Sequence, residues 1–336
     1  MPRILIDMQV DQARLTHLQS HPGIVVDLVT PEERPRELPP ELLSEAEYLF
    51  CSFPPSNFDR LRKLRWIQLA SAGYSQLFGL GMAERGIRAT NARGCFDVPI
   101  AEWNIAMMVS LARDLRQMIR NQDAQVWDRG SRFQNEVRGL TVGLWGYGGI
   151  GRETARLAAA MGMTVHVLSR NGIKPINNIW CVPGTGDASG SLPDRVFLKG
   201  QEPEFLSGLD FLILAMPLTS STEGIVGERE FKALRPSTFV LNPSRGPLIR
   251  EQALIHALRA GWIAGAAIDT HHRYPLPAEH PLWRFPNVIL TPHISGSSLS
   301  PHFRERIWQI FLENVKRIEA GEPLLNELTP EQLSGA

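Results

Sequence analysis

Six consecutive residues have the spacing of a loop that binds phosphate groups. They read Gly146-Tyr147-Gly148-Gly149-Ile150-Gly151, with glycine at the first, third and sixth positions. The first glycine permits a tight turn, the second lets the backbone approach a pyrophosphate, and the third lets a helix pack closely on a strand. The motif follows an apolar run over 140–145 and opens an Ala-rich helical stretch over 152–161. This context predicts a dinucleotide site; the alternative is a glycine-rich turn without a ligand.

The end of the next apolar run indicates which dinucleotide is preferred. An acid at this place hydrogen-bonds the ribose 2′-hydroxyl, whereas a basic residue favours a 2′-phosphate. The run over 165–168 ends in Ser169 and Arg170, with no acid. We therefore predict that NADP(H) is preferred over NAD(H). The alternative is that Arg170 is a solvated loop residue and that both cofactors bind.

The elements that must position these loops are visible as short apolar runs alternating with helical stretches. This alternation predicts parallel sheets with crossover helices. Helices are expected over about 100–125 and 301–320, and the Pro- and Gly-rich stretch 171–200 is expected to be an irregular insertion. The expected strands cover residues 4–6, 24–26, 48–50, 66–69, 140–145, 165–168, 211–214, 238–241, 265–268 and 288–290.

The composition is that of an ordinary globular protein. The 336 residues are enough for about two domains, and the 35 basic residues balance the 35 acidic ones. Because there is no basic excess, we expect no nucleic-acid partner. No apolar run is long enough to cross a bilayer, so we expect no membrane partner either. The chain begins as a strand, and its three cysteines have no metal or redox spacing, which favours a cytoplasmic protein without a bound metal.

Several motifs, in this order along the chain, resemble those of the D-isomer-specific 2-hydroxyacid dehydrogenases. The resemblance covers most of the chain, and the ordered set is more specific than any one motif. The ending Ser169-Arg170 is most similar to the NADPH-using glyoxylate and hydroxypyruvate reductases of that family. The matching segments are 91–94 with 101–102, the glycine loop, 217–219 with Thr222, 242–246, Asp269 with 275–277, and 291–293.

The resemblance implies an α/β architecture of two parallel-sheet domains, of Rossmann or flavodoxin type, with a cleft between them. Residues 1–97 and 298–336 would form the substrate (catalytic) domain, which the C-terminal helix completes. Residues 98–297 would form the dinucleotide-binding domain, with the insertion near 171–200. A homodimer is implied as well, with the helix over 100–125 in its interface.

The resemblance also implies hydride transfer between NAD(P)(H) and a small 2-oxo or 2-hydroxy acid. Arg245 is suited to bind the carboxylate and carbonyl oxygens of such a substrate, because its planar fork pairs with both. His293 is suited to protonate the ketone oxygen, because its pKa lies near working pH. Without the motifs, a surface ion pair for Arg245 and a structural role for His293 would be the alternatives.

Further residues are expected to contact the cofactor or the substrate. The resemblance places Pro217 and Thr222 beside the cofactor and Asp269 on its nicotinamide side, with a helix cap as the alternative for Asp269. The substrate carboxylate is expected at the backbone amides of Ser71, Ala72 and Gly73. A plain turn explains that segment equally well, since its glycine only permits a close backbone approach.

The sequence departs from the family at the partner of the histidine. Family members have a glutamate that keeps this histidine protonated, whereas Tyr274 occupies that position here. Tyrosine is neutral at physiological pH and supplies no negative charge. We therefore expect a lower pKa for His293 than is usual in the family, and an acid-shifted optimum for reduction. Unusual substrates, and weak or absent catalysis, are the other consequences considered.

Two rival functions remain at this stage. One is a cofactor-sensing binding protein without catalysis, which the tyrosine at position 274 leaves open. The other is a dehydrogenase of the same fold that acts on another small anion, such as formate or phosphite. The presence of both Arg245 and His293 favours an enzyme over a sensor, since a sensor requires neither.

Overall fold

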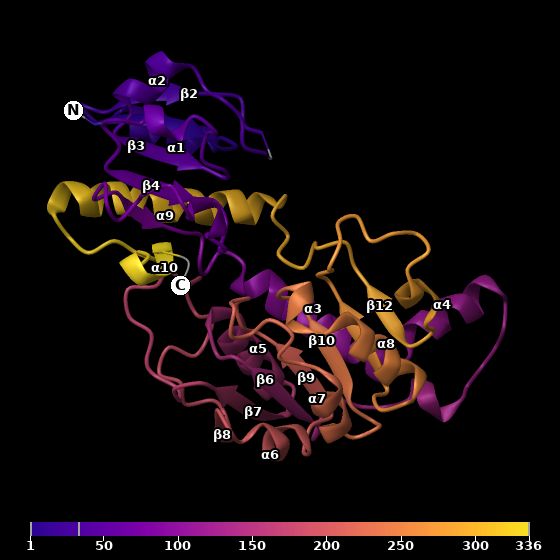
Figure 1. Cartoon of the computed structure of the whole chain (residues 1–336). Helices are drawn as coiled ribbons and strands as arrows, with labels where there is room; N and C mark the ends of the chain where they lie inside the picture. Colours follow the sequence, from indigo (N-terminus) through magenta and orange to yellow (C-terminus); the bar gives the residue numbers. More distant parts are fainter. Residues whose placement is uncertain (1, 33, 335–336) are drawn as a thin grey trace. The chain divides into compact units, whose positions relative to one another are not determined.

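The computed structural model describes residues 2–32 and 34–334 of the chain, which Figure 1 traces from end to end. The chain divides into two compact units. Unit 1 contains Met1–Phe96, Asn177–Val182 and Ser298–Ala336, and unit 2 contains Asp97–Ile176 and Pro183–Ser297. The segment 177–182 thus belongs to unit 1, whereas the whole insertion was expected in the dinucleotide-binding domain. Among the described residues, no helix has the length and apolar character needed to span a membrane.

Unit 1 contains a five-stranded parallel sheet with the order β2-β1-β3-β4-β5. Four of its strands lie on predicted apolar runs, while β5 is three residues long and carries an arginine. The strands are β1 (Arg3–Asp7), β2 (Val25–Leu28), β3 (Tyr48–Cys51), β4 (Trp66–Leu69) and β5 (Arg88–Thr90). The helices are α1 (Gln12–Gln19), α2 (Pro40–Glu45), α9 (Pro301–Ala320) and α10 (Pro330–Ser334).

Helix α9 supplies a large part of the core of unit 1, as expected of the C-terminal helix. Its Trp308 and Phe311 are fully buried. The ring of Phe311 stacks on Phe50 of β3 and on Trp66 of β4, with centroid distances of 4.4 and 5.4 Å. Because these aromatic side chains make up much of the buried apolar surface, the sheet of unit 1 depends on α9 for its stability.

The segment 177–182 is bound to unit 1 by polar contacts around Asn326. The Trp180 amide donates to Asn326 Oδ1 at 3.1 Å, and the Asn326 amide donates to the carbonyl of Asn178 at 3.2 Å. Gly94 has a φ of +93°, and a Cβ at this position would collide with the carbonyl of Trp180. Only glycine therefore allows this close approach without strain.

Unit 2 contains a seven-stranded parallel sheet with the order β12-β11-β10-β9-β6-β7-β8. Its strands are β6 (Thr141–Trp145), β7 (Thr164–Ser169), β8 (Arg195–Leu198), β9 (Phe211–Leu214), β10 (Phe239–Asn242), β11 (Gly265–Ile268) and β12 (Val288–Leu290). Its helices are α3 (Asp97–Ala112), α4 (Leu115–Asp123), α5 (Gly149–Ala160), α6 (Glu202–Leu206), α7 (Glu228–Ala233) and α8 (Glu251–Arg259). The predicted α/β class with two parallel sheets is confirmed.

Helices cover both faces of the sheet of unit 2. Alternate residues of β9 enter different cores: Leu212 and Leu214 pack with α6, α7 and α8, whereas Phe211 and Ile213 pack with α3 and α5. The chain begins this sheet at β6, adds β7 and β8 on one side, and then continues on the other side with β9. The loop after β6 therefore lies where the strand order reverses, which is where ligands of such sheets bind.

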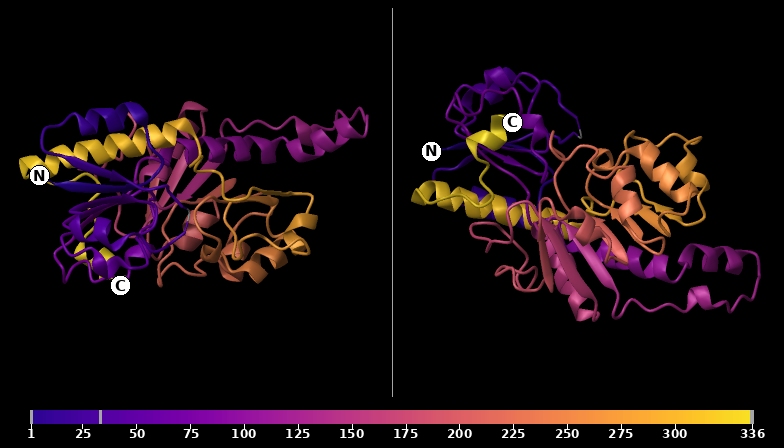
Figure 2. Two further views of the ribbon diagram at one scale, coloured as in Figure 1. Left: turned by 90° about the horizontal axis from the view of Figure 1, so that it is seen from above. Right: turned by 60° about the horizontal axis from the view of Figure 1, so that its bottom comes forward.

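Two expectations about elements were wrong. The single helix expected over 100–125 is two helices, α3 and α4, because Asp114 adopts a left-handed conformation with a φ of +48°. The insertion is not irregular throughout, because its residues 195–198 form β8 at the edge of the sheet. Figure 2 shows α4 and the segment after it extending away from the body of unit 2.

Candidate functional site

The glycine loop connects β6 to α5, as its motif predicts. Gly146 has a φ of +102°, and a Cβ there would meet the backbone of Ala215 at 2.5 Å. A Cβ at Gly151 would meet the carbonyl of Gly146 at 2.7 Å, so the helix packs closely on the turn. At Gly148, by contrast, no atom lies within 4 Å of the Cβ position. A Cβ at Gly149 would collide with the carboxylate of Asp97, so the loop is open at Gly148 alone, where the backbone is accessible to a pyrophosphate.

The end of β7 presents a basic side chain at the same sheet edge. Ser169 donates through its hydroxyl to the carbonyl of Gly172 at 2.8 Å, and Arg170 pairs with Gly172 through a backbone bridge. The Arg170 side chain is exposed. The turn is therefore ordered by Ser169 while the guanidinium stays accessible to a ligand.

The loop after β9 brings Pro217 and Thr222 together. The Thr222 hydroxyl donates to the carbonyl of Pro217 at 2.8 Å and accepts from the Thr219 amide at the same distance. These bonds close a compact turn at the carboxyl end of β9, next to β6 in the sheet. Both residues thus lie at the edge that carries the glycine loop, and their contact with a cofactor stays a prediction.

Asp269 follows β11 directly, and its buried carboxylate organises the loop that carries His293. Oδ1 accepts from the Thr291 hydroxyl at 2.5 Å and from the Ile294 amide at 2.9 Å. Oδ2 accepts from the amide and the hydroxyl of Ser295, at 3.0 and 2.5 Å. The His293 amide donates to the Asp269 carbonyl at 2.9 Å, and His293 itself has a φ of +58°. Asp269 therefore fixes the backbone that presents the imidazole.

Arg245 is held by the residues that end β10. The Asn242 side chain, which is buried, accepts from the Ser244 amide at 3.1 Å and donates to the Arg245 carbonyl at 2.8 Å. The Ser244 hydroxyl donates to the carbonyl of Leu214 at 2.6 Å, which ties this turn to β9. The Arg245 side chain is exposed, with Nη1 donating to the carbonyl of Ser244 at 2.7 Å. Sequence reasoning quoted Asn242 as part of a motif and did not identify this positioning role.

Arg245 and His293 lie in loops at the same edge of the sheet, because β10, β11 and β12 are adjacent parallel strands and the His293 amide donates to the carbonyl of Asp269 after β11. His293 is exposed as a residue, but partial desolvation of its imidazole lowers the pKa below its ordinary value. The negative charge of Asp269 opposes this effect, and the positive charge of Arg245 adds to it. The guanidinium and the imidazole, which are far apart in the sequence, are therefore brought to neighbouring loops of one sheet edge.

Tyr274 lies beside His293 without a hydrogen bond to it. The two ring centroids are 5.5 Å apart, and the planes are tilted by 43°. The Tyr274 hydroxyl instead accepts from the amide of His271 at 3.1 Å. The phenol thus contacts the histidine through its ring and leaves the imidazole without an anionic partner at this position. The causes of the lowered His293 pKa do not include Tyr274, so a pKa lower than is usual in the family stays a prediction.

Ser71, Ala72 and Gly73 form a turn after β4 in unit 1. The Ser71 hydroxyl donates to the Gly73 carbonyl at 2.7 Å, and the Asn91 side chain donates to the Ala72 carbonyl at 2.7 Å. Within the part of the chain that the structure describes, the three backbone amides have no acceptor. These amides are available to an anion, and their role as a carboxylate site stays a prediction.

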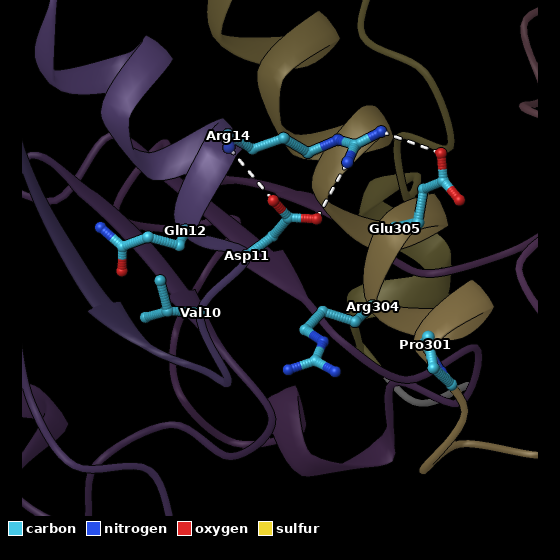
Figure 3. A pocket seen from close by; sticks show the side chains of 7 residues that line it. All are labelled: Val10, Asp11, Gln12, Arg14, Pro301, Arg304 and Glu305. Carbon is cyan, nitrogen blue, oxygen red and sulfur yellow. Dashed lines mark hydrogen bonds and ion pairs between the residues drawn. The ribbon is translucent and has the colours of Figure 1, made fainter.

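Unit 1 also has a surface pocket of about 410 Å³ that contains none of the predicted site residues. In Figure 3, Arg14 lies between Asp11 and Glu305 and forms ion pairs with both, at 2.9 and 3.2 Å. The lining residues are Val10, Asp11, Gln12, Arg14, Pro301, Arg304 and Glu305. Across residues 2–32 and 34–334, no group of three or more His, Cys, Asp or Glu side chains is placed to hold a metal ion.

Sequence reasoning missed a set of buried polar residues around the glycine loop. Asp187, in the insertion, accepts from the hydroxyl of Tyr147 at 2.7 Å. Arg152, which follows the last glycine of the motif, is 4% exposed. The only available signal was the polar character of Arg152 at the start of an otherwise Ala-rich helix.

Comparison with known proteins agrees with this arrangement. The family described as "D-isomer specific 2-hydroxyacid dehydrogenase, NAD binding domain" matches residues 105–181 and 189–295. A glyoxylate reductase of Thermococcus gammatolerans is 30% identical over 334 residues, covering 96% of this chain and 94% of the relative.

Solved structures of similar proteins cover nearly the whole chain. A D-isomer specific 2-hydroxyacid dehydrogenase family protein of Aeromonas salmonicida is 26% identical, with a TM-score of 0.80, and covers 98% of this chain and 99% of its own. A D-isomer specific 2-hydroxyacid dehydrogenase of Xanthobacter autotrophicus, in complex with NADPH and MES, is 27% identical, with a TM-score of 0.76 and the same coverage. The chain therefore belongs to the D-isomer specific 2-hydroxyacid dehydrogenase family and is an NAD(P)-dependent oxidoreductase.

Proposed function

We propose that this protein reduces a small 2-oxo acid, of the size of glyoxylate or hydroxypyruvate, with NADPH as the preferred cofactor. The observation that carries the proposal is the placement of Arg245 and His293 in loops at the carboxyl edge of the adjacent parallel strands β10, β11 and β12. A guanidinium and an imidazole are the two groups needed to hold a carboxylate and to protonate a ketone oxygen. The name of the Thermococcus gammatolerans relative supports a substrate of this size.

The proposed mechanism assigns one task to each residue. Arg245 binds the substrate carboxylate and polarises the carbonyl, while His293, as imidazolium, donates a proton to the carbonyl oxygen. A bound NADPH supplies the hydride. Asp269 acts through His293, because its buried carboxylate is saturated by the loop over 291–295. The amides of 71–73 are proposed to bind carboxylate oxygens as well.

The preference for NADPH is supported by the end of β7. Arg170 is exposed, and the residues Ser169 and Arg170 offer no acid to repel a 2′-phosphate. The related protein from Xanthobacter autotrophicus binds NADPH in its structure. Comparing kcat/KM for NADPH and NADH tests the preference, and a clear preference for NADH would refute it.

A homodimer formed through the region of α3 and α4 is proposed in addition. Four large apolar side chains are exposed in α4 and in the segment directly after it: Leu115, Ile119, Val126 and Trp127, the last with 90% exposure. An exposed apolar cluster of this kind marks an interaction surface. Sedimentation of the protein, with Trp127→Ser as the variant, tests the dimer. A cytoplasmic location stays a prediction from the sequence.

Loss of NADPH absorbance with glyoxylate, hydroxypyruvate and a panel of larger 2-oxo acids tests the reaction. Turnover with at least one of them is expected. Tight NADPH binding without turnover would favour the cofactor sensor, which the absence of an anionic partner at Tyr274 keeps as the second candidate. The assay run in the oxidative direction with formate and phosphite separates the third candidate.

A further inference from the structure

The part of the insertion that precedes β8 is attached to the glycine loop by buried polar contacts. Tyr147, between the first two glycines of the motif, donates its hydroxyl to Asp187 Oδ2 at 2.7 Å. Arg152, directly after the last glycine, extends its guanidinium over the Tyr147 ring, with 4.9 Å from Cζ to the centroid. Two residues of the cofactor loop thus contact one aspartate of the insertion.

Asp187 gathers a turn of the insertion around its carboxylate. Oδ1 accepts from the amides of Gly190 and Ser191, at 3.0 and 3.1 Å, and from the Ser189 hydroxyl at 3.2 Å. Oδ2 accepts from the Leu192 amide at 3.1 Å in addition to the Tyr147 hydroxyl. Burial alone would raise the pKa of Asp187, but these hydrogen bonds outweigh it and hold the pKa below its usual value. The carboxylate is therefore ionised at neutral pH, when it accepts all of these bonds.

Arg152 fastens both ends of the stretch 175–186. Its Nη2 donates to the carbonyl of Lys174 at 2.5 Å, and its Nη1 donates to the carbonyl of Asp187. Its Nε donates to the carbonyl of Tyr147 at 3.3 Å, so the same guanidinium also holds the glycine loop. The neighbouring Glu153 accepts from the Gly186 amide at 2.6 Å. The first turn of α5 therefore anchors the insertion with two charged side chains, both of which are buried.

These contacts restrict the backbone of the glycine loop at Tyr147, beside the open position at Gly148. Moving the backbone of Tyr147 would break its hydrogen bonds to Asp187 and Arg152, and a buried charged group that loses a partner is costly. The loop is thus held in one conformation before any ligand arrives. A binding loop that is ordered in advance does not lose conformational entropy when its ligand binds.

We propose that Tyr147, Arg152 and Asp187 are positioning residues for the cofactor, which use the insertion to hold the glycine loop in its binding conformation. The inference rests on dinucleotide binding by this loop. It assigns the insertion a role in cofactor affinity, and none in the chemical step.

The test compares NADPH binding by the wild type, Tyr147→Phe and Asp187→Asn. Tyr147→Phe removes one hydroxyl and keeps the ring under Arg152. We expect the Kd for NADPH to rise about threefold to tenfold, the size that the loss of one charge-assisted hydrogen bond produces, with kcat unchanged at saturating NADPH. The double variant should lose little more than Asp187→Asn alone, because that variant already disturbs the bond that Tyr147→Phe removes. Tyr48→Phe, a buried tyrosine in β3, is the matched control and should keep the wild-type Kd.

Hydrogen exchange provides a readout that does not depend on turnover. In Tyr147→Phe the amides of 190–192 should exchange faster than in the wild type, and NADPH should slow their exchange in both proteins. An unchanged Kd in both variants, or a lower kcat with an unchanged Kd, would overturn the inference. If the wild type itself binds no dinucleotide, the proposed function fails instead, so the two failures are distinguishable.

Discussion

Two buried aspartates of unit 2 each stabilise one short loop through hydrogen bonds to its amides and hydroxyls. Asp269 accepts four hydrogen bonds from residues 291–295, and Asp187 accepts four from residues 189–192 together with one from Tyr147. Each carboxylate thus gathers the amides and hydroxyls of one short loop. The first loop presents His293, which we assign to proton transfer, and the second holds the glycine loop, which we assign to cofactor binding.

The difference lies in what each loop is connected to. Asp269 follows β11 at the carboxyl edge of the sheet and positions His293. Asp187, in contrast, lies in the insertion and positions the glycine loop. Similar local energetics should therefore give different kinetic effects. Mutations at the two sites should separate kcat from the affinity for NADPH.

The largest effects on the reaction rate are expected for substitutions of His293 and Arg245. His293→Asn should lower kcat/KM for 2-oxo acid reduction by about 10²–10⁴, the usual contribution of a general acid. Arg245→Met should lower it by roughly 10²–10³, because a positioned charge on the oxyanion is lost. Steady-state rates measure both, and NADPH binding by fluorescence should stay unchanged. Wild-type rates in either variant would remove that residue from the mechanism.

Replacing each aspartate by asparagine tests the comparison directly. Asp269→Asn and Asp187→Asn should each lower the free energy of unfolding by about 1–3 kcal/mol, since an amide nitrogen then faces N–H and O–H donors. Urea unfolding measures this loss. Initial rates should show a lower kcat for Asp269→Asn and a higher KM for NADPH for Asp187→Asn. The same kinetic parameter changing in both variants would contradict the comparison.

A substitution of Arg170 tests the preference for NADPH over NADH. Arg170→Glu should lower the ratio of kcat/KM for NADPH to that for NADH by roughly tenfold, the size of one charge-assisted hydrogen bond. An acid at this place also accepts a hydrogen bond from a ribose 2′-hydroxyl. Arg195→Glu, which replaces an exposed arginine of β8, is the control and should leave the ratio unchanged. A ratio unaffected by Arg170→Glu would show that Arg170 does not contact the cofactor.

The smallest expected effect is a shift in the pH dependence of the reduction rate, which depends on the pKa of His293. Partial desolvation and Arg245 lower the pKa of His293, so the imidazolium needed for reduction is lost as pH rises through a value below the ordinary 6.5. Reduction by the wild type should therefore be fastest on the acid side. Tyr274→Glu adds a negative charge and should move the limb upward by about one pH unit. Tyr274→Gln adds no charge and should leave the limb of the pH profile where it is in the wild type. The same pH profile for Tyr274→Glu and Tyr274→Gln would refute the role assigned to the charge at position 274.

Much of the fold was predictable because apolar runs mark buried strands. Two strands were missed for different reasons: β5 is Arg88-Ala89-Thr90 and has no apolar run, whereas the short apolar run 196–198 of β8 lies within a Pro- and Gly-rich stretch, which predicts a loop. The break at Asp114 was hidden as well, since the apolar periodicity continues across a single left-handed residue. Local patterns report burial, and they do not report one backbone angle.

The candidate site was predictable only where its residues lie in motifs at strand ends. Arg245 and His293 follow β10 and β12, where parallel strands bring side chains together. The contacts of Asp187 with Tyr147 and Arg152 join residues 40 and 35 positions apart. Such pairs have no periodicity and no motif in the sequence, so only the three-dimensional structure reveals them.

The three-part composition of unit 1 has a consequence for synthesis. The ribosome produces residues 97–297 before helix α9, whose Trp308 and Phe311 fill the aromatic core of unit 1. Domains generally fold in the order in which they are made, but here the unit that begins first finishes last. Until α9 emerges, the face of the N-terminal sheet that packs on it is covered by α1 but lacks the aromatic side chains of α9. That nascent sheet is therefore the surface on which a chaperone would act, or from which aggregation would start.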